Sequence, residues 1–414
     1  MNTGLLSFVQ AAEIVAEYAR AIAAQPHAVE HVPLSEAPGR FLAEPIVAHE
    51  DQPPFPRSTR DGFACRAAEA NAHAVLPVAG FTRAGDPLPP PLPAFSFRQI
   101  MTGAAVPEGA DAVVMVEHVE HADGHARLLP PRTLEPGENI VVRAAQARAG
   151  DVLLQPGTLI TPAQIALAAS CGYASLAVLA RPRVAILTTG DELVPVDAVP
   201  GPGKIRNSNA PMLAALVAAA GGEPLVLPTA ADTAEALDAA FASALNADLL
   251  LISGGVSAGT HDLVEPALEK LGARFFFTGI RIQPGKPLVF GQLSRASGPA
   301  LPLFGLPGNP ISSAATFRLF AQPVLAALAG SNDHGPHFVA AQLAARVKTK
   351  PGLTRFLPAL CNFAAPGAGL PAVELVPWHG SGDLTAFARA NCFLVVPEDV
   401  DALHPGTVVR ILVY

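Results

Sequence analysis

Apolar residues recur at helical spacing near the start of the chain and at strand spacing soon afterwards. Over residues 8–18 they follow the period of an amphipathic helix, and Ser7 precedes this helix as a suitable N-cap. From about residue 50 to residue 142, short apolar runs alternate with turn residues such as Asp123-Gly124. This stretch is therefore predicted to be a β domain.

A second helical segment follows the β stretch. Thr161 and Pro162 supply an N-cap and a first-turn proline, and Gly172 ends the helix. Because helical segments stand on both sides of residues 50–142, we expect the β domain to be inserted into a helical first domain made of residues 1–49 and 143–180.

From residue 181 the pattern becomes a regular alternation of strands and helices. Apolar runs at 184–187, 224–227 and 249–252 are separated by helical segments, which requires crossover connections and a parallel sheet covered on both faces. We therefore predict a multidomain α/β protein whose centre, residues 181–329, is a doubly wound, mostly parallel sheet. Short strands return over residues 330–414 and predict a C-terminal β domain.

A glycine-rich segment directly follows the third of these strands. It contains the small residues Ser253, Gly254, Gly255, Ser257 and Gly259 and ends at Asp262. Small residues leave backbone N–H groups accessible, and a helix start behind them attracts anions, so the segment is typical of a phosphate-binding loop. Asp262 would repel a phosphate unless a cation lay between them. The loop therefore indicates phosphate and metal together.

Acidic residues at other strand ends extend this interpretation. Glu192 follows the first strand, and Glu192, Asp262 and, less securely, Asp232 would lie at the carboxyl ends of three strands of one sheet, where ligands bind. Carboxylate oxygens beside a phosphate loop are typical ligands of Mg²⁺. Taken alone, the segment around Gly190 and Asp191 is a turn with a helix-capping acid, and only the combination favours a metal.

Basic residues occur in two polar segments of the same region. Lys286 lies between Pro284 and Pro287 and is one of only five lysines, so we expect it to bind an anion. Residues 204–209 either bind another anion or cap the following helix. Within the β domain, the polar loops 53–63 and 98–111 would by themselves be interpreted as turns.

The overall composition argues against several kinds of partner. With 35 acidic and 27 basic residues, the chain is not expected to bind nucleic acid or an anionic membrane. The first 25 residues lack the pattern of a signal peptide, and uncharged apolar runs stay shorter than about 18 residues, so we expect a cytoplasmic protein. The motifs of serine hydrolases, zincins and P-loop NTPases are absent.

Six motifs, taken together and in order, resemble one known family. They are Arg-Asp-Gly-Phe at 60–63, Met-Thr-Gly-Ala at 101–104, Thr-Gly-Asp-Glu-Leu at 189–193, Ser-Gly-Gly-Val-Ser-Ala-Gly at 253–259, Pro-Gly-Lys-Pro at 284–287 and Gly-Leu-Pro-Gly-Asn-Pro at 305–310. This combination resembles the molybdopterin molybdenumtransferases, the MoeA family, which is related to the gephyrin E domain. The resemblance covers nearly the whole chain.

The resemblance implies both a fold and a reaction. The fold is an elongated homodimer of four-domain chains, with a central domain like that of the molybdopterin adenylyltransferases and a C-terminal β-barrel. The reaction is the insertion of molybdenum from molybdate into adenylylated molybdopterin, with Mg²⁺-dependent hydrolysis of the pyrophosphate bond and release of AMP. Transient contact with molybdopterin adenylyltransferase and with molybdoenzyme chaperones is also implied.

The resemblance assigns roles to individual residues in a cleft between two subunits. Catalytic roles fall on Asp61, Thr102, Glu192, Asp262 and Lys286, and metal-binding roles on Glu192, Asp232 and Asp262. Further residues are expected to bind the phosphates and substrate, namely Ser253, Gly254, Gly255, Ser257, Gly259, Pro307, Gly308, Asn309 and Ser381.

Three positions depart from the family pattern. Gln146 stands at a usually acidic position, Gln283 where a lysine is frequent, and Leu353 where an arginine is common, with Arg355 two residues later. These departures keep open a divergent paralogue that acts as a scaffold or binds molybdopterin without catalysis. A molybdopterin adenylyltransferase that uses the central domain alone is a further alternative.

Overall fold

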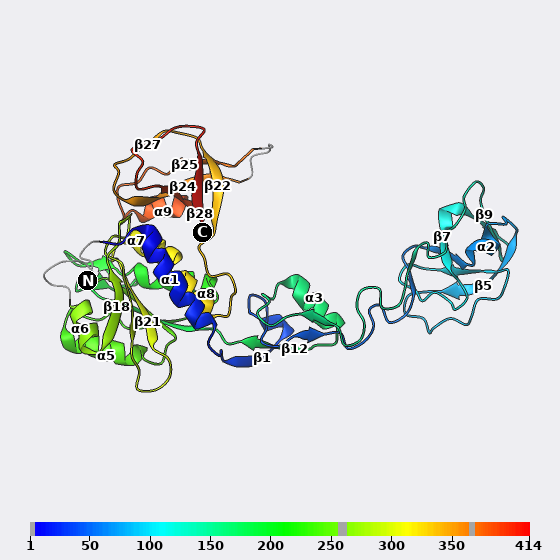
Figure 1. Ribbon diagram of the computed structural model, residues 1–414, viewed down its shortest axis with the longest axis horizontal. Helices are drawn as coiled ribbons and strands as arrows, with labels where there is room; N and C mark the ends of the chain where they lie inside the picture. Colours follow the sequence, from blue (N-terminus) through cyan, green and yellow to red (C-terminus); the bar gives the residue numbers. More distant parts are fainter. Residues whose placement is uncertain (1–4, 256–262, 364–368) are drawn as a thin grey trace.

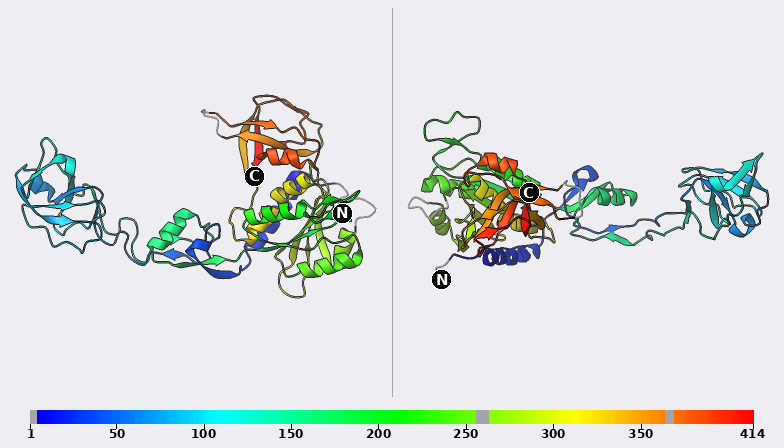
Figure 2. Two further views of the ribbon diagram at one scale, coloured as in Figure 1. Left: turned by 180° about the vertical axis from the view of Figure 1, so that it is seen from behind. Right: turned by 90° about the horizontal axis from the view of Figure 1, so that it is seen from above.

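The protein is an elongated molecule whose inserted β domain lies at the opposite end from the central sheet (Figures 1 and 2). The computed structural model describes residues 5–255, 263–363 and 369–414. The C-terminal barrel rests against the central domain, and a small lobe that contains strand β1 and helix α3 lies between these two and the distant β domain. The multidomain α/β architecture predicted from the sequence is confirmed.

The central sheet has six strands. The first four in spatial order are parallel to one another, and each of the last two pairs antiparallel with the strand before it. In that order they are β16 (Glu223–Val226), β13 (Arg183–Thr188), β17 (Leu249–Ser253), β21 (Leu301–Leu306), β20 (Val289–Leu293) and β18 (Ala273–Thr278). The predicted strands at 184–187, 224–227 and 249–252 are β13, β16 and β17. The sheet is mostly parallel, as expected.

Alternate residues of β13 enter two different cores, which shows that both faces of the sheet are covered. Val184 and Ile186 pack in one core, and Ala185 and Leu187 in the other. The first core includes residues of α1 (Phe8–Ala23), α4 (Asn209–Ala219), α7 (Pro310–Thr316) and α8 (Gln322–Leu328). The second includes residues of α5 (Ala234–Ala244) and α6 (Val264–Lys270).

Helices α7 and α8 form one continuous helix, Pro310–Leu328, with a π-helical segment at Phe317–Ala321 between them. Pro323 lacks a backbone N–H, and the wider π-helical turn lies directly before it. This helix is long and apolar enough to cross a membrane, but 78% of its most apolar window is buried inside the protein. Such burial is typical of a helix in a protein core.

The N-terminal helix α1 differs from the expected grouping. Ser7 caps it, and Ser7 and Gln10 form a capping box. Its apolar side packs on α8 and the central core, where Phe8 contacts the rings of Phe320 and Phe356. The sequence placed this helix with α3 (Pro162–Ser170) in one helical domain, whereas the structure places α1 on the central domain and α3 in the middle lobe (Figure 1).

Paired strands from both sides of the insertion build the middle lobe. Strand β1 (Val29–Pro33) pairs with β12 (Ser175–Leu179), and β2 (Ile46–Val47) pairs with β11 (Val152–Leu154). The lobe also contains the short 3₁₀ helix Leu34–Glu36. The residues before and after the insertion therefore form one unit.

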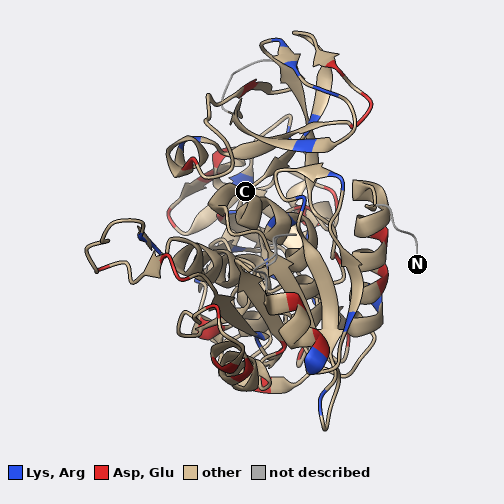
Figure 3. Ribbon diagram, turned by 90° about the vertical axis from the view of Figure 1, so that its left-hand side faces the viewer, with Lys and Arg blue, Asp and Glu red and all other residues tan. Residues whose placement is uncertain are grey.

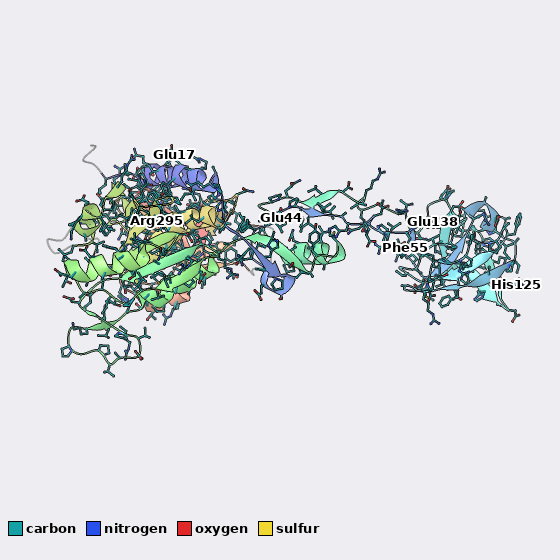
Figure 4. The ribbon with its side chains drawn as sticks, turned by 90° about the horizontal axis from the view of Figure 1, so that it is seen from below. Glu17, Glu44, Phe55, His125, Glu138 and Arg295 are labelled. Atoms are coloured by element: carbon teal, nitrogen blue, oxygen red, sulfur yellow. The ribbon has the colours of Figure 1, made fainter. Side chains whose placement is uncertain are left out.

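Two extended segments connect the middle lobe to the β domain. Gln52 forms a bridge with Ala147, and β3 (Arg57–Ser58) pairs with β10 (Ile140–Val141). At their base, the Asp51 carboxylate accepts hydrogen bonds from Arg143 Nε at 2.6 Å and from the Ala149 N–H at 3.0 Å. Phe55 lies on this connection (Figure 4). The β domain is thus held at a distance by a narrow, paired connection.

The β domain contains a six-stranded sheet, the short α-helix α2 (Ala67–Ala70) and the 3₁₀ helix Val116–His118. Its strands, in spatial order, are β7 (Ala112–Met115), β4 (Gly62–Cys65), β6 (Phe97–Ile100), β5 (Leu76–Thr82), β9 (His125–Leu128) and β8 (Val119–Ala122). Asp123 and Gly124, with φ angles of 47° and 73°, connect β8 to β9. The hairpin predicted at this dipeptide is confirmed.

The C-terminal strands close into a five-stranded barrel. In order around the barrel they are β24 (Thr354–Asn362), β25 (Ala372–Leu375), β22 (Phe338–Leu343), β28 (Val408–Val413) and β26 (Cys392–Val396), which pairs again with β24. The short strand β19 (Ile282–Gln283) of the central domain pairs with β24. The segment around Lys286 is thereby anchored to the barrel.

Charges of both signs are distributed over the central domain and the barrel. Viewed along the long axis, acidic and basic positions are interspersed on these two parts (Figure 3). A protein that binds a nucleic-acid backbone usually carries a stripe of basic side chains instead.

Candidate functional site

A pocket of about 230 Å³ lies at the carboxyl ends of the parallel strands, where open α/β sheets bind their ligands. Its walls come from segments that follow β13, β16, β17 and β21 and from the loop between β19 and β20. The lining residues are Thr189, Gly190, Glu192, Asp232, Gly254, Gly255, Pro287, Pro307 and Gly308. Six of these were predicted as site residues: Glu192, Asp232, Gly254, Gly255, Pro307 and Gly308.

The glycine segment after β17 comes very close to the end of β13. Gly254 has a φ of +96°, and a Cβ atom there would lie 2.5 Å from the Thr189 carbonyl oxygen. Gly255 has a φ of +62°, and a Cβ there would lie 2.7 Å from the Thr189 hydroxyl. Both positions require glycine, for conformation and for space. This close packing places a bare backbone against the pocket, as phosphate binding requires.

Two carboxylates, Glu192 and Asp232, line the pocket with the glycine segment, and the Asp191 carboxylate lies next to Asp232. The Glu192 side chain folds over Gly190, where an added Cβ would lie 2.6 Å from Glu192 Oε2. The Asp232 N–H donates to Asp191 Oδ1 at 3.3 Å. Burial, the Asp191 charge and the Glu192 charge raise the pKa of Asp232, although a hydrogen bond from the Asp191 backbone to the Asp232 carboxylate acts in the opposite direction. A nearby cation would relieve this repulsion.

The donor set suits Mg²⁺ bound jointly with a phosphate. The described residues contain no group of three or more His, Cys, Asp or Glu side chains that could by itself hold a metal ion. Mg²⁺ needs no such group when substrate is present, because it commonly uses one or two carboxylates together with phosphate oxygens and water. Glu192 and Asp232 line one pocket with the glycine segment and can supply these carboxylates.

Lys286 lies next to the pocket in a constrained loop. Its carbonyl accepts a hydrogen bond from the Ile280 N–H at 2.9 Å. The preceding Gly285 has a φ of +111°, and a Cβ there would lie 2.5 Å from the Thr316 methyl group. Pro287 lines the pocket, and the Lys286 side chain is exposed. The loop therefore fixes the backbone of Lys286 and leaves its ammonium group accessible.

Two of the departures from the family pattern meet at Arg355. Arg355 Nε donates to Gln283 Oε1 at 2.9 Å, and its Nη1 donates to the Leu353 carbonyl at 3.1 Å. The chain thus keeps a guanidinium between these two positions. The third departure, Gln146, donates its backbone N–H to Gln52 in the connection to the β domain, away from the pocket.

Asn309 and Ser381 meet at the start of α7. Asn309 is the N-cap residue of this helix, and the Ile311 N–H donates to the Ser381 carbonyl at 3.0 Å. A Cβ at Gly382 would lie 3.8 Å from Asn309 Oδ1. The turn that contains Ser381 is held in place by Asp383, which caps α9 (Leu384–Arg389). These contacts place the predicted barrel loop beside the Pro307–Gly308 segment.

Asp61 and Thr102 form a pair in the distant β domain. Asp61 Oδ1 accepts hydrogen bonds from the Thr102 N–H and the Thr102 hydroxyl, both at 2.7 Å. These bonds hold the pKa of Asp61 below its ordinary value, the backbone bond contributing most. The hydroxyl proton is used within the pair, so Thr102 primarily orients Asp61. Within one chain this pair lies far from the pocket (Figure 1).

We expect Thr102→Val to raise the pKa of Asp61 part of the way to its ordinary value. The variant loses the hydroxyl bond and keeps the stronger backbone bond. A carboxylate with a depressed pKa stabilises the folded state above its unfolded-state pKa, and this stabilisation disappears as the pH falls through the folded-state pKa. Titration of the Asp61 carboxyl carbon by NMR measures the shift, and an unchanged pKa would contradict the pairing.

Three predicted residues, Ser257, Gly259 and Asp262, lie outside the described residues. Their assigned roles therefore stay predictions from the sequence.

Some residues of the site were not predicted. The Thr189 hydroxyl is buried, and it has no hydrogen-bond partner within the described part of the chain. It belongs to the Thr-Gly-Asp-Glu-Leu motif, which was the feature of the sequence that could have identified it.

The segment 204–209 mainly stabilises local structure, since Lys204 Nζ donates to the Asp191 carbonyl and Asn207 Oδ1 caps α4 by accepting from the Ala210 N–H.

Comparison with protein families gives matches along nearly the whole chain. Residues 6–172 match the MoeA N-terminal region (domain I and II), residues 185–327 a probable molybdopterin binding domain, and residues 340–414 the MoeA C-terminal region (domain IV).

Individual proteins give the same result. The chain is 35% identical over 392 residues to a molybdopterin molybdenumtransferase of Haemophilus influenzae, covering 93% of this chain and 94% of the relative. It is 36% identical over 396 residues to that of Bacillus subtilis, covering 92% and 89%. A crystal structure of the molybdopterin biosynthesis MoeA protein from Pyrococcus horikoshii is similar with a TM-score of 0.81 at 28% identity, covering 99% of this chain and 100% of that chain.

Proposed function

Since the chain belongs to the MoeA family, whose members named above are molybdopterin molybdenumtransferases, it is a transferase of molybdenum cofactor biosynthesis, and we propose the details of its reaction. Molybdenum from molybdate is inserted into adenylylated molybdopterin. The pyrophosphate bond of this substrate is hydrolysed in the process, and AMP is released.

One observation carries this proposal. The pocket at the carboxyl ends of the strands combines an exposed glycine backbone with two acidic side chains, Glu192 and Asp232. A phosphate site alone would not favour two carboxylates, because they repel the ligand. A metal site alone would not need the close backbone approach at Gly254. The combination fits a substrate whose phosphates bind together with a divalent cation.

The roles follow from the charges of the groups. N–H groups of the Gly254–Gly255 segment and the exposed ammonium group of Lys286 neutralise phosphate oxygens. Glu192 and Asp232 would hold Mg²⁺ against the pyrophosphate, and the bound ion would supply Lewis-acid polarisation of the bond to be broken. Asp61, kept ionised by Thr102, orients the attacking water or the molybdate end of the substrate.

The separation of Asp61 from the pocket supports a site built by two chains. Asp61 and Thr102 lie in the β domain at one end of the molecule, and the pocket lies at the other. In a symmetric homodimer the β domain of one subunit can face the central domain of its partner, and a twofold axis then creates two equivalent composite sites. We place the substrate cleft between the subunits for this reason.

A reconstituted reaction tests the proposal. The purified protein is incubated with adenylylated molybdopterin, molybdate and Mg²⁺, and both AMP and active molybdenum cofactor are measured. Formation of both products together supports the proposal. Formation of adenylylated molybdopterin from ATP and molybdopterin would instead favour an adenylyltransferase, and the absence of either reaction would favour a scaffold.

We expect Asp232→Asn to weaken Mg²⁺ binding and to raise the melting temperature of the protein at neutral pH. The raised pKa of Asp232 means that its charge destabilises the folded state once the pH exceeds the unfolded-state pKa, and the neutral amide removes this repulsion. Loss of one metal ligand should weaken Mg²⁺ binding about 10-fold or more. Titration with Mn²⁺ followed by electron paramagnetic resonance, with substrate present, measures the affinity.

The control for this prediction is Asp238→Asn, which changes a half-buried acid on α5 that pairs with Lys270 at 3.0 Å and does not line the pocket. It should leave the metal affinity unchanged. A fall in melting temperature for Asp232→Asn, or equal metal affinity in the two variants, would contradict the assignment.

A further inference from the structure

Asn209 connects the two loops that form opposite walls of the pocket. It is the first residue of α4 and is 9% exposed. Its Nδ2 donates to Ser253 Oγ at 2.8 Å and to the Gly308 carbonyl at 2.7 Å. Ser253 immediately precedes the glycine segment, and Gly308 lines the pocket from the loop after β21. One side-chain amide therefore bonds to both walls.

These two hydrogen bonds, called here the Asn209 bridge, extend the pairing of β17 with β21. The paired residues of these strands end at Ser253 and Leu306. Beyond them the Gly254 N–H reaches the Leu306 carbonyl at 3.3 Å, and a Cβ at Gly308 would lie 3.7 Å from Gly254 Cα. The loops touch at this point, and the Asn209 bridge is positioned to fix their separation.

The chemistry at this position requires a donor. A backbone carbonyl can only accept, so the Gly308 oxygen fixes the orientation of the amide and excludes a carboxylate. The Asn209 Oδ1 atom is buried without a hydrogen-bond partner among the described residues. A buried polar atom without a hydrogen-bond partner lowers the stability of the folded state. The side chain is thus placed for the two bonds of its Nδ2 rather than for complete hydrogen bonding.

Asn207 provides an internal comparison. It is similarly buried, at 8%, and its Nδ2 donates to the hydroxyls of Thr188 and Thr229 at 2.8 and 3.2 Å. Its Oδ1 caps α4. Its partners stabilise the sheet edge and the helix start, and Asn207 does not line the pocket. Two asparagines two residues apart thus have different partners.

We propose that Asn209 is a positioning residue that sets the distance between the glycine segment and the Gly308 loop, and with it the affinity of the pocket for phosphate groups. The second part rests on the proposed function, since it takes the pocket as the phosphate site. The first part concerns the protein alone. The two parts can therefore be tested separately.

The test compares Asn209→Asp with Asn207→Asp, both nearly isosteric changes. At position 207 a carboxylate can still accept from the Thr188 and Thr229 hydroxyls and from the Ala210 N–H, whereas at position 209 it faces the Gly308 carbonyl. Amide hydrogen exchange of the ligand-free protein should become about 10-fold faster at residues 253–255 and at Leu306, Gly308 and Asn309 in Asn209→Asp, a loss of about 1.4 kcal/mol of local stability. Asn207→Asp should leave these two segments unchanged.

Steady-state kinetics test the second part. For Asn209→Asp we expect the KM for adenylylated molybdopterin to rise about 10-fold with kcat changed less than about 3-fold, and for Asn207→Asp neither to change. Equal exchange in the two variants would overturn the positioning role. Faster exchange without a change in KM would show that Asn209 connects the loops but that the phosphates bind elsewhere, which overturns the affinity role. If the unaltered protein does not insert molybdenum, the proposed function is contradicted. The hydrogen-exchange result then still decides whether Asn209 positions the two loops.

Discussion

Mixing chains that carry Asp61→Asn with chains that carry Glu192→Gln is expected to restore roughly a quarter of the molybdenum-insertion activity of the unaltered protein. Each variant alone should lose activity by about 100-fold or more, because each removes a charged group from every site. Random exchange of subunits makes half of the dimers mixed. If each site takes its β domain from one chain and its pocket from the other, one site of each mixed dimer is free of both changes.

The control mixes Asp61→Asn with Thr102→Val. Both changes lie in the β domain, so every composite site retains one of them, and activity should stay at the average of the two separate variants. Mass spectrometry of the intact dimers confirms that subunits have exchanged. Recovery no greater than in this control would show that a shared site does not form.

Gly254→Ala is expected to lower activity strongly and to destabilise the central domain. The methyl group would lie 2.5 Å from the Thr189 carbonyl oxygen, and alanine is strained at a φ of +96°. Backbone atoms on both sides must move to relieve the contact, which adds about 1–3 kcal/mol to a strain of about 1 kcal/mol. Displacing the glycine segment by about 1 Å should lower activity by about 100-fold.

Gly221→Ala separates the backbone strain of alanine at a positive φ from the collision of its methyl group with neighbouring atoms. Gly221 has a φ of +85°, and nothing lies within 4 Å of an added Cβ, so this variant carries the strain without the collision. It should lower stability by only about 1 kcal/mol and retain activity. Scanning calorimetry and the AMP assay compare the two variants. Similar behaviour of both would mean that the close approach at Thr189 does not shape the pocket.

The sequence predicted the pocket because its parts lie at the ends of strands. Apolar runs defined β13 and β17, and residues directly after parallel strands share one sheet edge, so Glu192 and Gly254 had to lie close together. Such inferences need only local patterns and one rule of topology. The position of these residues at one pocket therefore follows from local sequence, whereas their roles stay predictions.

Contacts between segments far apart in the chain could not be predicted from the sequence in this way. The amphipathic pattern of α1 shows that one side is buried but not which surface covers it, and the structure shows that α8 does. The contact of Arg355 with Gln283 depends on the pairing of β19 with β24, two strands far apart in the chain. Local periodicity contains no information on either choice.

Asn209 shows a second reason why part of the site could not be predicted from the sequence. An asparagine just before a helix is usually interpreted as an N-cap, and residues 204–209 offered two of them. Asn207 takes the capping role, which leaves the amide of Asn209 available for Ser253 and Gly308. Only the three-dimensional arrangement of the two loops distinguishes the residue that caps the helix from the one that bridges the pocket.

The paired connection between the middle lobe and the β domain acts mechanically as a lever arm. Its base is fixed by Asp51, through Arg143 and Ala149, while Asp61 lies beyond its far end. A rotation of a few degrees at the base is amplified along the arm, so a small angular change would carry Asp61 into or out of reach of a partner's pocket. The stiffness of this connection, rather than any contact within the β domain, would then set how often the composite site is complete.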